Sequence, residues 1–255
     1  SKMPELELWM LHRLWEMDKF IRASCKEYLF HPLFTELHNF CSVDLSAFYF
    51  DIRKDSLYCD SASSITRRAS QTVLNEIFNC LTAWLAPFIC FTAEEAWLSR
   101  NPGDHQSVHL RLFPEISKKW SNPLIAEKWV KIRRLRRVVT GALEIERAEK
   151  RVGSSLQSAP VIYTNEEYEN ALSSMSSSEM ADLFITSGVS FSRSTPPATA
   201  FSLEDVEGVA VFPKMAVGKK CERCWKVLDD VGSKSNHPDV CLRCADTVDQ
   251  TAELF

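Results

Sequence analysis

Residues 6–28 read LELWMLHRLWEMDKFIRASCKEY, and every third or fourth position in this stretch is apolar. The apolar positions are Leu6, Met10, Leu14, Met17, Ile21, Cys25 and Tyr28. This spacing follows the turn of an α-helix and predicts a helix with one buried face.

More helices are expected in the first 153 residues, because only two of the seven glycines precede Gly153. Stripes of helical spacing predict them over 33–40, 45–57 and 65–84, around Trp97, and from Pro123 to near Gly153. Ser63 or Ser64 is expected to cap the helix over 65–84 and Thr92 the short one, whereas residues 108–113 alternate and are expected to be extended. Several helices joined by short links indicate an antiparallel bundle.

The pattern of apolar residues changes from helical spacing to short runs after residue 159. Short apolar runs predict strands at 161–163, 184–186, 189–191 and 209–212, with a helix over 166–175. The fold class is therefore mainly α: an antiparallel helical bundle, then a small α+β unit and a C-terminal zinc-ribbon-like module. The expected segments are 1–115 for the bundle, 116–158 for a long basic helix that continues it, 159–213 for the α+β unit and 214–255 for the cysteine module.

Charge is distributed unevenly along the chain. The net charge is −4, yet residues 118–151 hold eleven Lys or Arg and four Glu, a local charge of +7. Arg133, Arg134 and Arg137 lie within one helical turn of each other and form a basic stripe. Such a stripe can bind a polyanion even on an acidic protein, although a solvated face paired with Glu127 and Glu144 is the alternative.

Four of the nine cysteines form two Cys-x2-Cys pairs, Cys221 with Cys224 and Cys241 with Cys244, separated by 16 residues. Two such pairs can present four thiolates tetrahedrally to one Zn2+. Four thiolates leave no position for a reactive water, so the expected zinc is structural. His237 could replace one cysteine, but its place before Pro238 favours a turn.

Basic residues surround the first cysteine pair, and Trp225 follows it directly. These basic residues are Lys214, Lys219, Lys220, Arg223 and Lys226. An indole beside cations can stack an unpaired base while the cations bind phosphates. The alternative is that Trp225 packs over the zinc site as a core residue.

No nucleophile–base pair, phosphate-binding loop or catalytic zinc motif is present, so no catalytic residue is named. The longest apolar stretch, 81–93, is shorter than the roughly 20 residues of a membrane span, and no membrane partner is expected. A protein-interaction scaffold stabilised by zinc is the competing interpretation. A DNA-binding zinc ribbon explains the sequence less well, because binding duplex DNA does not require a large acidic bundle. A hydrolase is the least favoured interpretation, because no nucleophile–base pair can be named.

Several motifs carry a family resemblance. They are NFCSVDLSAFYFDIRKDSLY at 39–58, LAPF at 85–88 with FTAEEAW at 91–97, SVHL at 107–110 with FPE at 113–115, RVGSSL at 151–156, KCERCW at 220–225 and CLRCA at 241–245. In this order they resemble the anticodon-binding bundle and zinc module of bacterial isoleucyl-tRNA synthetases. The class I HIGH and KMSKS motifs, which bind ATP, are absent. The resemblance implies the C-terminal portion of such an enzyme, without its catalytic and editing domains.

The resemblance also implies a mode of binding. The partner would be the anticodon stem-loop of an isoleucine tRNA, with Trp225 stacked on an anticodon base and Lys219, Lys220 and Arg223 beside it. Backbone contacts would extend to Arg53, Lys54, Arg133, Arg134 and Arg137. The parent enzyme would attach isoleucine to its tRNA with ATP, and the fragment itself would be inactive. We expect a cytoplasmic monomer that does not bind DNA.

Overall fold

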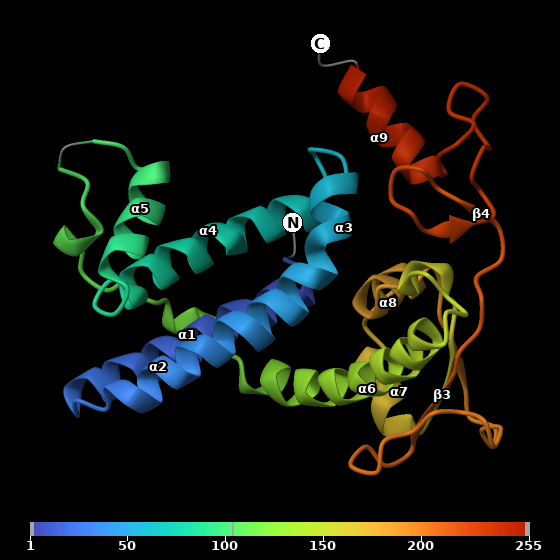
Figure 1. Cartoon of the computed structure of the whole chain (residues 1–255), viewed down its shortest axis with the longest axis horizontal. Helices are drawn as coiled ribbons and strands as arrows, with labels where there is room; N and C mark the ends of the chain where they lie inside the picture. Colours follow the sequence, from blue (N-terminus) through green and yellow to red (C-terminus); the bar gives the residue numbers. More distant parts are fainter. Residues whose placement is uncertain (1–2, 104, 253–255) are drawn as a thin grey trace. The chain divides into compact units, whose positions relative to one another are not determined.

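The computed structural model describes residues 3–103 and 105–252 (Figure 1). The chain forms two compact units, Ser1–Asp51 with Ser63–Ala126 and Ile52–Ala62 with Glu127–Phe255. Residues 1, 2, 104 and 253–255, which the segments expected from the sequence include, lie outside the described residues. Each unit is described by itself.

The first unit is helical and begins with α1 (Glu5–Lys26). The predicted face is buried from Leu6 to Ile21. The prediction is wrong for Tyr28, which is 79% exposed and has a φ of 57°. The helix ends two residues earlier, and Tyr28 forms the left-handed turn that leads into α2.

The helices predicted over 33–40 and 45–57 are one uninterrupted run. It consists of α2 (Phe30–Asn39), the π-helix η1 (Phe40–Phe50) and α3 (Asp51–Cys59), of which residues 52–59 belong to the second unit. Asn39 and Asp51 both have helical φ and ψ values, so no break separates the three parts. In the first unit α1 packs against α2 (Figure 1).

Two further α-helices complete this unit. α4 (Ile65–Leu85) also packs against α1, and Ser64 caps it by accepting from the N–H of Arg67, as predicted. α5 (Cys90–Arg100) begins before Thr92, so Thr92 lies inside the helix and the predicted cap is wrong.

The segments between α5 and the next long helix hold two single turns of 3-10 helix, η2 (Val108–Leu110) and η3 (Lys118–Trp120). The extended conformation expected over 108–113 is wrong at its start. The Glu94 carboxylate accepts from the Val108 N–H at 2.7 Å and Ser107 accepts from the His109 N–H at 3.2 Å. These two bonds cap the start of η2, and the N–H of Leu110 closes the turn by donating to the carbonyl of Ser107 at 3.1 Å.

A polar group lies inside the first unit. Glu7 on α1 is fully buried and accepts from the hydroxyl of Tyr49 on η1 at 3.2 Å and from that of Ser70 on α4 at 3.0 Å. Hydrogen bonds of this kind offset the cost of burying a carboxyl group and hold three helices in register.

The second unit is built on α6 (Pro123–Ala148), the long helix predicted after Pro123, of which residues 123–126 belong to the first unit. Apolar residues three or four positions apart on one face of this helix are buried, namely Trp129, Ile132, Leu135, Val139 and Leu143. A Cβ at Gly141 would lie 2.7 Å from a ring carbon of Phe201, so only glycine lets this ring approach the helix. α6 is followed by one 3-10 turn, η4 (Ser155–Gln157).

A three-stranded sheet accompanies α6. Its order is β2-β1-β3, with β1 (Val161–Thr164) parallel to β2 (Ser190–Ser192) and antiparallel to β3 (Val209–Phe212). α7 (Glu166–Leu172) and α8 (Ser177–Phe184) connect β1 to β2. The strand predicted over 184–186 is wrong, because a capping box of Ser176 and Glu179 starts a helix that runs through Phe184.

The cysteine module closes the second unit. It holds the two-stranded hairpin of β4 (Lys219–Lys220) and β5 (Val227–Leu228) and the helix α9 (Leu242–Ala252). The mainly helical fold with a small sheet and a cysteine module is thus confirmed. Among residues 3–103 and 105–252, no helix combines the length and apolar character that a membrane crossing requires.

Candidate functional site

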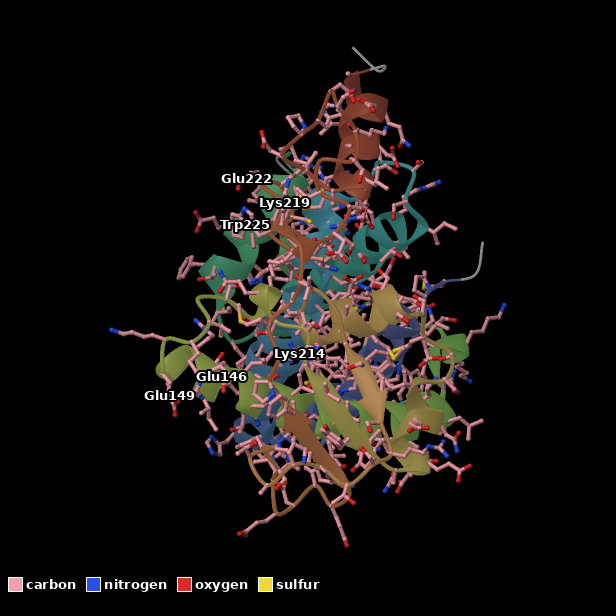
Figure 2. All side chains as sticks on the ribbon, turned by 90° about the vertical axis from the view of Figure 1, so that its right-hand side faces the viewer. Glu146, Glu149, Lys214, Lys219, Glu222 and Trp225 are labelled. Atoms are coloured by element: carbon pink, nitrogen blue, oxygen red, sulfur yellow. The ribbon has the colours of Figure 1, made fainter. Side chains whose placement is uncertain are left out.

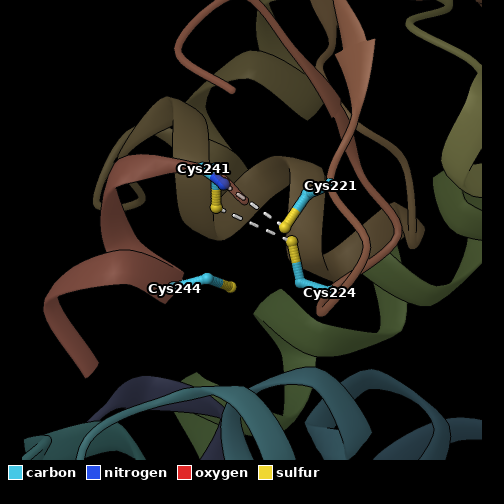
Figure 3. Close-up of side chains that lie close together, drawn as sticks. All are labelled: Cys221, Cys224, Cys241 and Cys244. Carbon is cyan, nitrogen blue, oxygen red and sulfur yellow. Dashed lines mark hydrogen bonds between the residues drawn. The ribbon is translucent and has the colours of Figure 1, made fainter. Parts of the chain in front are cut away.

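The four cysteines predicted to bind metal meet at one point (Figure 3). All four are buried, and their Sγ atoms lie within 4.8 Å of one another. Four sulfurs placed about 2.3 Å from one zinc ion, at the corners of a tetrahedron, lie about 3.8 Å apart. The Sγ atoms of Cys224 and Cys241 are 3.8 Å apart. The donor type, number and spacing therefore fit one zinc ion.

Local backbone hydrogen bonds shape both cysteine pairs. In the first, the N–H of Cys221 donates to the carbonyl of Lys226 at 2.8 Å, and the N–H of Trp225 donates back to that of Cys221 at 2.9 Å. In the second, the N–H of Ala245 donates to the carbonyl of Cys241 at 2.9 Å as α9 begins. The Cys241 N–H also donates to the Cys221 Sγ at 3.4 Å, which links the two pairs.

Three of the clustered thiols, Cys224, Cys241 and Cys244, shift one another's pKa. Hydrogen bonds from Cys224, Cys241 and Cys59 lower the pKa of Cys244, and Arg223 lowers it further against the opposing effect of burial. The contact with Cys244 at the same time raises the pKa of Cys224 and of Cys241. Because the thiolate is the form that ligates zinc, metal binding must displace protons from this cluster. Four thiolates complete the coordination sphere of zinc, so a bound zinc supports the fold and leaves no position for a reacting water.

Trp225 is on the surface of this module. Its side chain is 60% exposed, and the Nζ of Lys220 lies 5.9 Å from the ring centroid. Its φ of 66° is the left-handed conformation, which is uncommon for residues other than glycine. Trp225 and Lys219 come from the same side of the second unit, and Lys214 lies further along that side (Figure 2). The alternative in which Trp225 packs over the zinc site as a core residue is therefore wrong.

Lys219 and Lys220 are exposed on β4, but Arg223 is held by the protein. Its Nη1 donates to the carbonyl of Cys59 at 2.5 Å and its Nη2 to that of Tyr58 at 3.1 Å. Sequence reasoning did not foresee this, because the partners lie 164 and 165 residues earlier.

Lys226, the next cation after Trp225, is not available to a ligand either. It is only 7% exposed and forms an ion pair with Asp182 at the end of α8. Like Arg223, it joins the cysteine module to the rest of its own unit.

Much of the basic stripe on α6 is paired within the second unit. Arg137 forms an ion pair with Asp205 at 2.8 Å, Arg136 donates to the carbonyl of Leu183 at 2.9 Å, and Lys131 pairs with Glu167 at 2.9 Å. Of the three predicted contact residues, Arg134 and Arg137 are exposed and Arg133 is half-buried.

On α3, Lys54 is exposed, whereas Arg53 is only 8% exposed. A buried guanidinium can contact a nucleic-acid backbone only after a rearrangement. Among the predicted contact residues, the exposed ones in the second unit are Lys54, Arg134, Arg137, Lys219, Lys220 and Trp225.

The structure also places at the cysteine module residues that the sequence did not single out. Cys59 is buried in one apolar cluster with the four cysteines. Asp55 and Asp60, at the end of the same helix, bind Arg243 from the second cysteine pair. Spacing alone gives no signal for these residues.

Comparison with known proteins matches both parts of the chain. Residues 7–163 match the family described as the anticodon-binding domain of tRNA ligase. Residues 218–247, which contain all four cysteines, match the zinc finger found in FPG and IleRS.

Individual relatives agree with this assignment. The chain is 48% identical to an isoleucine–tRNA ligase of Agrobacterium fabrum, an alignment that covers 100% of the chain and 26% of the relative. It is 47% identical to the isoleucine–tRNA ligase of Bartonella quintana, over 95% of the chain and 25% of the relative. It is 49% identical to that of Brucella abortus, over 96% of the chain and 25% of the relative. The chain thus spans about a quarter of the length of the curated relatives it matches.

The family match extends over more than half of the chain and agrees with the helical fold and with the cysteine cluster, as the resemblance of the sequence motifs implied. The chain belongs to the family of anticodon-binding domains of tRNA ligases, with isoleucine–tRNA ligases as its relatives.

Proposed function

We propose that this chain recognises the anticodon stem-loop of an isoleucine tRNA as part of an isoleucine–tRNA ligase. The whole ligase would attach isoleucine to its tRNA with ATP in the cytoplasm, and this chain would supply recognition and no catalytic group. We further propose that it acts as a monomer and that the division into segments 1–115, 116–158, 159–213 and 214–255 describes its organisation.

The observation that carries the proposal is the exposed indole of Trp225 beside Lys220, on a cysteine scaffold that fits zinc. An exposed aromatic face can stack an unpaired base, and nearby ammonium groups can bind the flanking phosphates. Exposure of Trp225 also argues against the scaffold interpretation, which required a buried indole.

In this proposal, contacts fall into two kinds. Trp225, Lys219 and Lys220 bind the unpaired anticodon, which differs between tRNAs. Lys54, Arg134 and Arg137 bind backbone phosphates, which all tRNAs share. The proposed set also keeps three arginines that are less accessible. Arg133 is half-buried, Arg223 is held by carbonyl groups, and Arg53 is buried.

The decisive experiment titrates the zinc-loaded chain with an isoleucine tRNA transcript and with the same transcript carrying a changed anticodon. We expect tighter binding to the native anticodon at physiological salt. Equal binding of both, with strong salt dependence, would reduce the function to nonspecific attraction by the exposed cations. Absence of binding to either transcript would reject the proposal and favour a protein partner.

A further inference from the structure

The two cysteine pairs share a feature besides their cysteines. Each has an arginine immediately before its second cysteine, Arg223 before Cys224 and Arg243 before Cys244. A metal that holds both cysteines of a pair also restricts the backbone between them. Both arginines therefore project from positions that metal binding would make rigid.

Arg223 reaches the last turn of α3. Its guanidinium donates to the carbonyls of Tyr58 and Cys59 at 3.1 and 2.5 Å. These carbonyls are among the last four of the helix, which have no partner within it, and a cation is favourable at this end of a helix. The same Nη1 lies 3.6 Å from the Sγ of Cys244. One guanidinium thus touches both the helix end and a predicted metal ligand.

Arg243 reaches the same segment from the other cysteine pair. It binds both carboxylate oxygens of Asp55 at 2.5 and 2.8 Å and one of Asp60 at 3.1 Å. Burial alone would lower the pKa of Arg243, but the hydrogen bonds and charge of Asp55 raise it overall. Bidentate pairs of this type are among the stronger polar contacts in proteins.

Cys59, at the end of α3, also contacts the cysteine module. Its thiol donates to the carbonyl of Arg223 at 3.8 Å, and its side chain is only 7% exposed. The end of α3 therefore forms part of the wall around the four cysteines, although it comes from the first quarter of the chain.

We propose that Arg223 and Arg243 are positioning residues that couple metal binding at the four cysteines to the order of residues 55–60. Zinc holds the cysteine pairs, the pairs hold the arginines, and the arginines hold the helix end. Linkage makes the coupling reciprocal, so the docked helix end strengthens zinc binding. The cysteine module is then not an autonomous zinc ribbon.

The first experiment measures zinc release from the full chain to the chromogenic chelator pyridylazoresorcinol. The variant is Asp55→Asn with Asp60→Asn, which removes the carboxylates and leaves every cysteine and arginine in place. Changes in the outer contacts of metal ligands typically weaken binding about 10–100-fold, so we expect release at least about tenfold faster. Asp229→Asn, an exposed aspartate in the same module, is the matched control and should release zinc like the parent chain.

The second experiment follows hydrogen exchange of residues 51–62 with zinc bound and after chelation. In the parent chain these amides should lose protection when zinc is removed, while α1 keeps its protection and shows that the first unit stays folded. In the Asp55→Asn and Asp60→Asn variant, protection of 51–62 should already be low with zinc bound. Unchanged protection in the parent chain, or a parental release rate in the variant, would overturn the proposal.

A third measurement separates the contact of Arg223 with sulfur from general support of the fold. In the cobalt-substituted chain, the sulfur-to-cobalt charge-transfer band reports the electron density on the thiolates. Arg223→Met removes a hydrogen bond to Cys244 and should move the band to longer wavelength, whereas Arg223→Lys should restore part of the shift. An unchanged band in Arg223→Met would overturn the role of Arg223. These measurements use no RNA, so their outcome is independent of tRNA recognition.

Discussion

The backbone N–H of Trp225 donates to the carbonyl of Cys221 at 2.9 Å, and this bond closes the first cysteine pair with Trp225 at a φ of 66°. Left-handed backbone costs a residue with a side chain roughly 1–2 kcal/mol, and glycine does not incur that cost. The chain thus holds an exposed indole in a conformation that glycine adopts more easily. A surface residue kept under this strain is a candidate for binding.

Replacement of Trp225 by Gly separates binding from folding. We expect the free energy of unfolding to stay the same or rise slightly, because glycine relieves the positive φ. Affinity for isoleucine tRNA should fall by about 1–3 kcal/mol, or roughly 5–150-fold, because one stacked base is lost. Chemical denaturation and fluorescence titration check the two parts. Phe91→Ala removes another exposed aromatic as the control, and an unchanged affinity in Trp225→Gly would reject stacking.

Asp205 restrains a cation of the basic stripe. The hydrogen bond from Arg137 lowers the pKa of this carboxyl group, which is therefore charged at neutral pH. Asp205→Asn removes the negative charge beside the proposed phosphate contact, so tRNA affinity should rise and its salt dependence should steepen by a fraction of a unit. Stability should hardly change, because both partners are exposed.

The matched control is Glu204→Gln, which removes one charge at the neighbouring exposed position. Arg134→Ala should act in the opposite direction, weakening binding and flattening the salt dependence by a fraction of a unit to about one unit. If Asp205→Asn and Arg134→Ala both bind with the salt slope of the parent chain, the stripe on α6 is only a solvated face.

Tyr49→Phe tests the polar contact inside the first unit. The hydroxyl of Tyr49 donates to Glu7 at 3.2 Å, and both residues are fully buried. Loss of this donor should lower the free energy of unfolding by about 1–3 kcal/mol, because a buried acceptor loses a partner. Denaturant titration gives the value. Tyr58→Phe changes the same group on a residue that is 77% exposed and should leave stability unchanged within about 0.5 kcal/mol. Equal effects of the two variants would contradict the buried contact.

Thiol labelling tests burial in the first unit. Burial raises the pKa of Cys80 to about 12, so at pH 8 only roughly one molecule in ten thousand carries this residue as thiolate. We expect Cys80 to resist iodoacetamide in the native chain, whereas the exposed Cys90 reacts. Mass spectrometry of the labelled peptides distinguishes the two, and denaturant should make both reactive. Labelling of native Cys80 as fast as Cys90 would be incompatible with the packing of α4.

The parts that could be predicted depend on neighbours close in the chain. The buried faces of α1 and α6 follow from apolar residues three or four positions apart, and the metal cluster follows from two Cys-x2-Cys pairs. Ser64 caps α4 through a contact three residues away. In each case the pattern and the structure that it specifies occupy the same short stretch.

The run over 184–186 shows where such reasoning fails. Three apolar or β-branched residues suit a strand as well as the last turn of a helix, and the capping box of Ser176 and Glu179 decides between them. The prediction of two separate helices over 33–40 and 45–57 fails for a similar reason. The apolar pattern has two stripes, but nothing in it shows whether the helix is interrupted between them, and the structure has one continuous run.

The sequence alone was therefore enough for the helical class and for the four-cysteine cluster that fits zinc. It was not enough for the role of Arg223, the burial of Arg53 and Lys226, or the place of Cys59 beside the cysteine cluster. Contacts between residues 164 apart leave no periodic trace in the chain, because their geometry exists only once the intervening segments have packed.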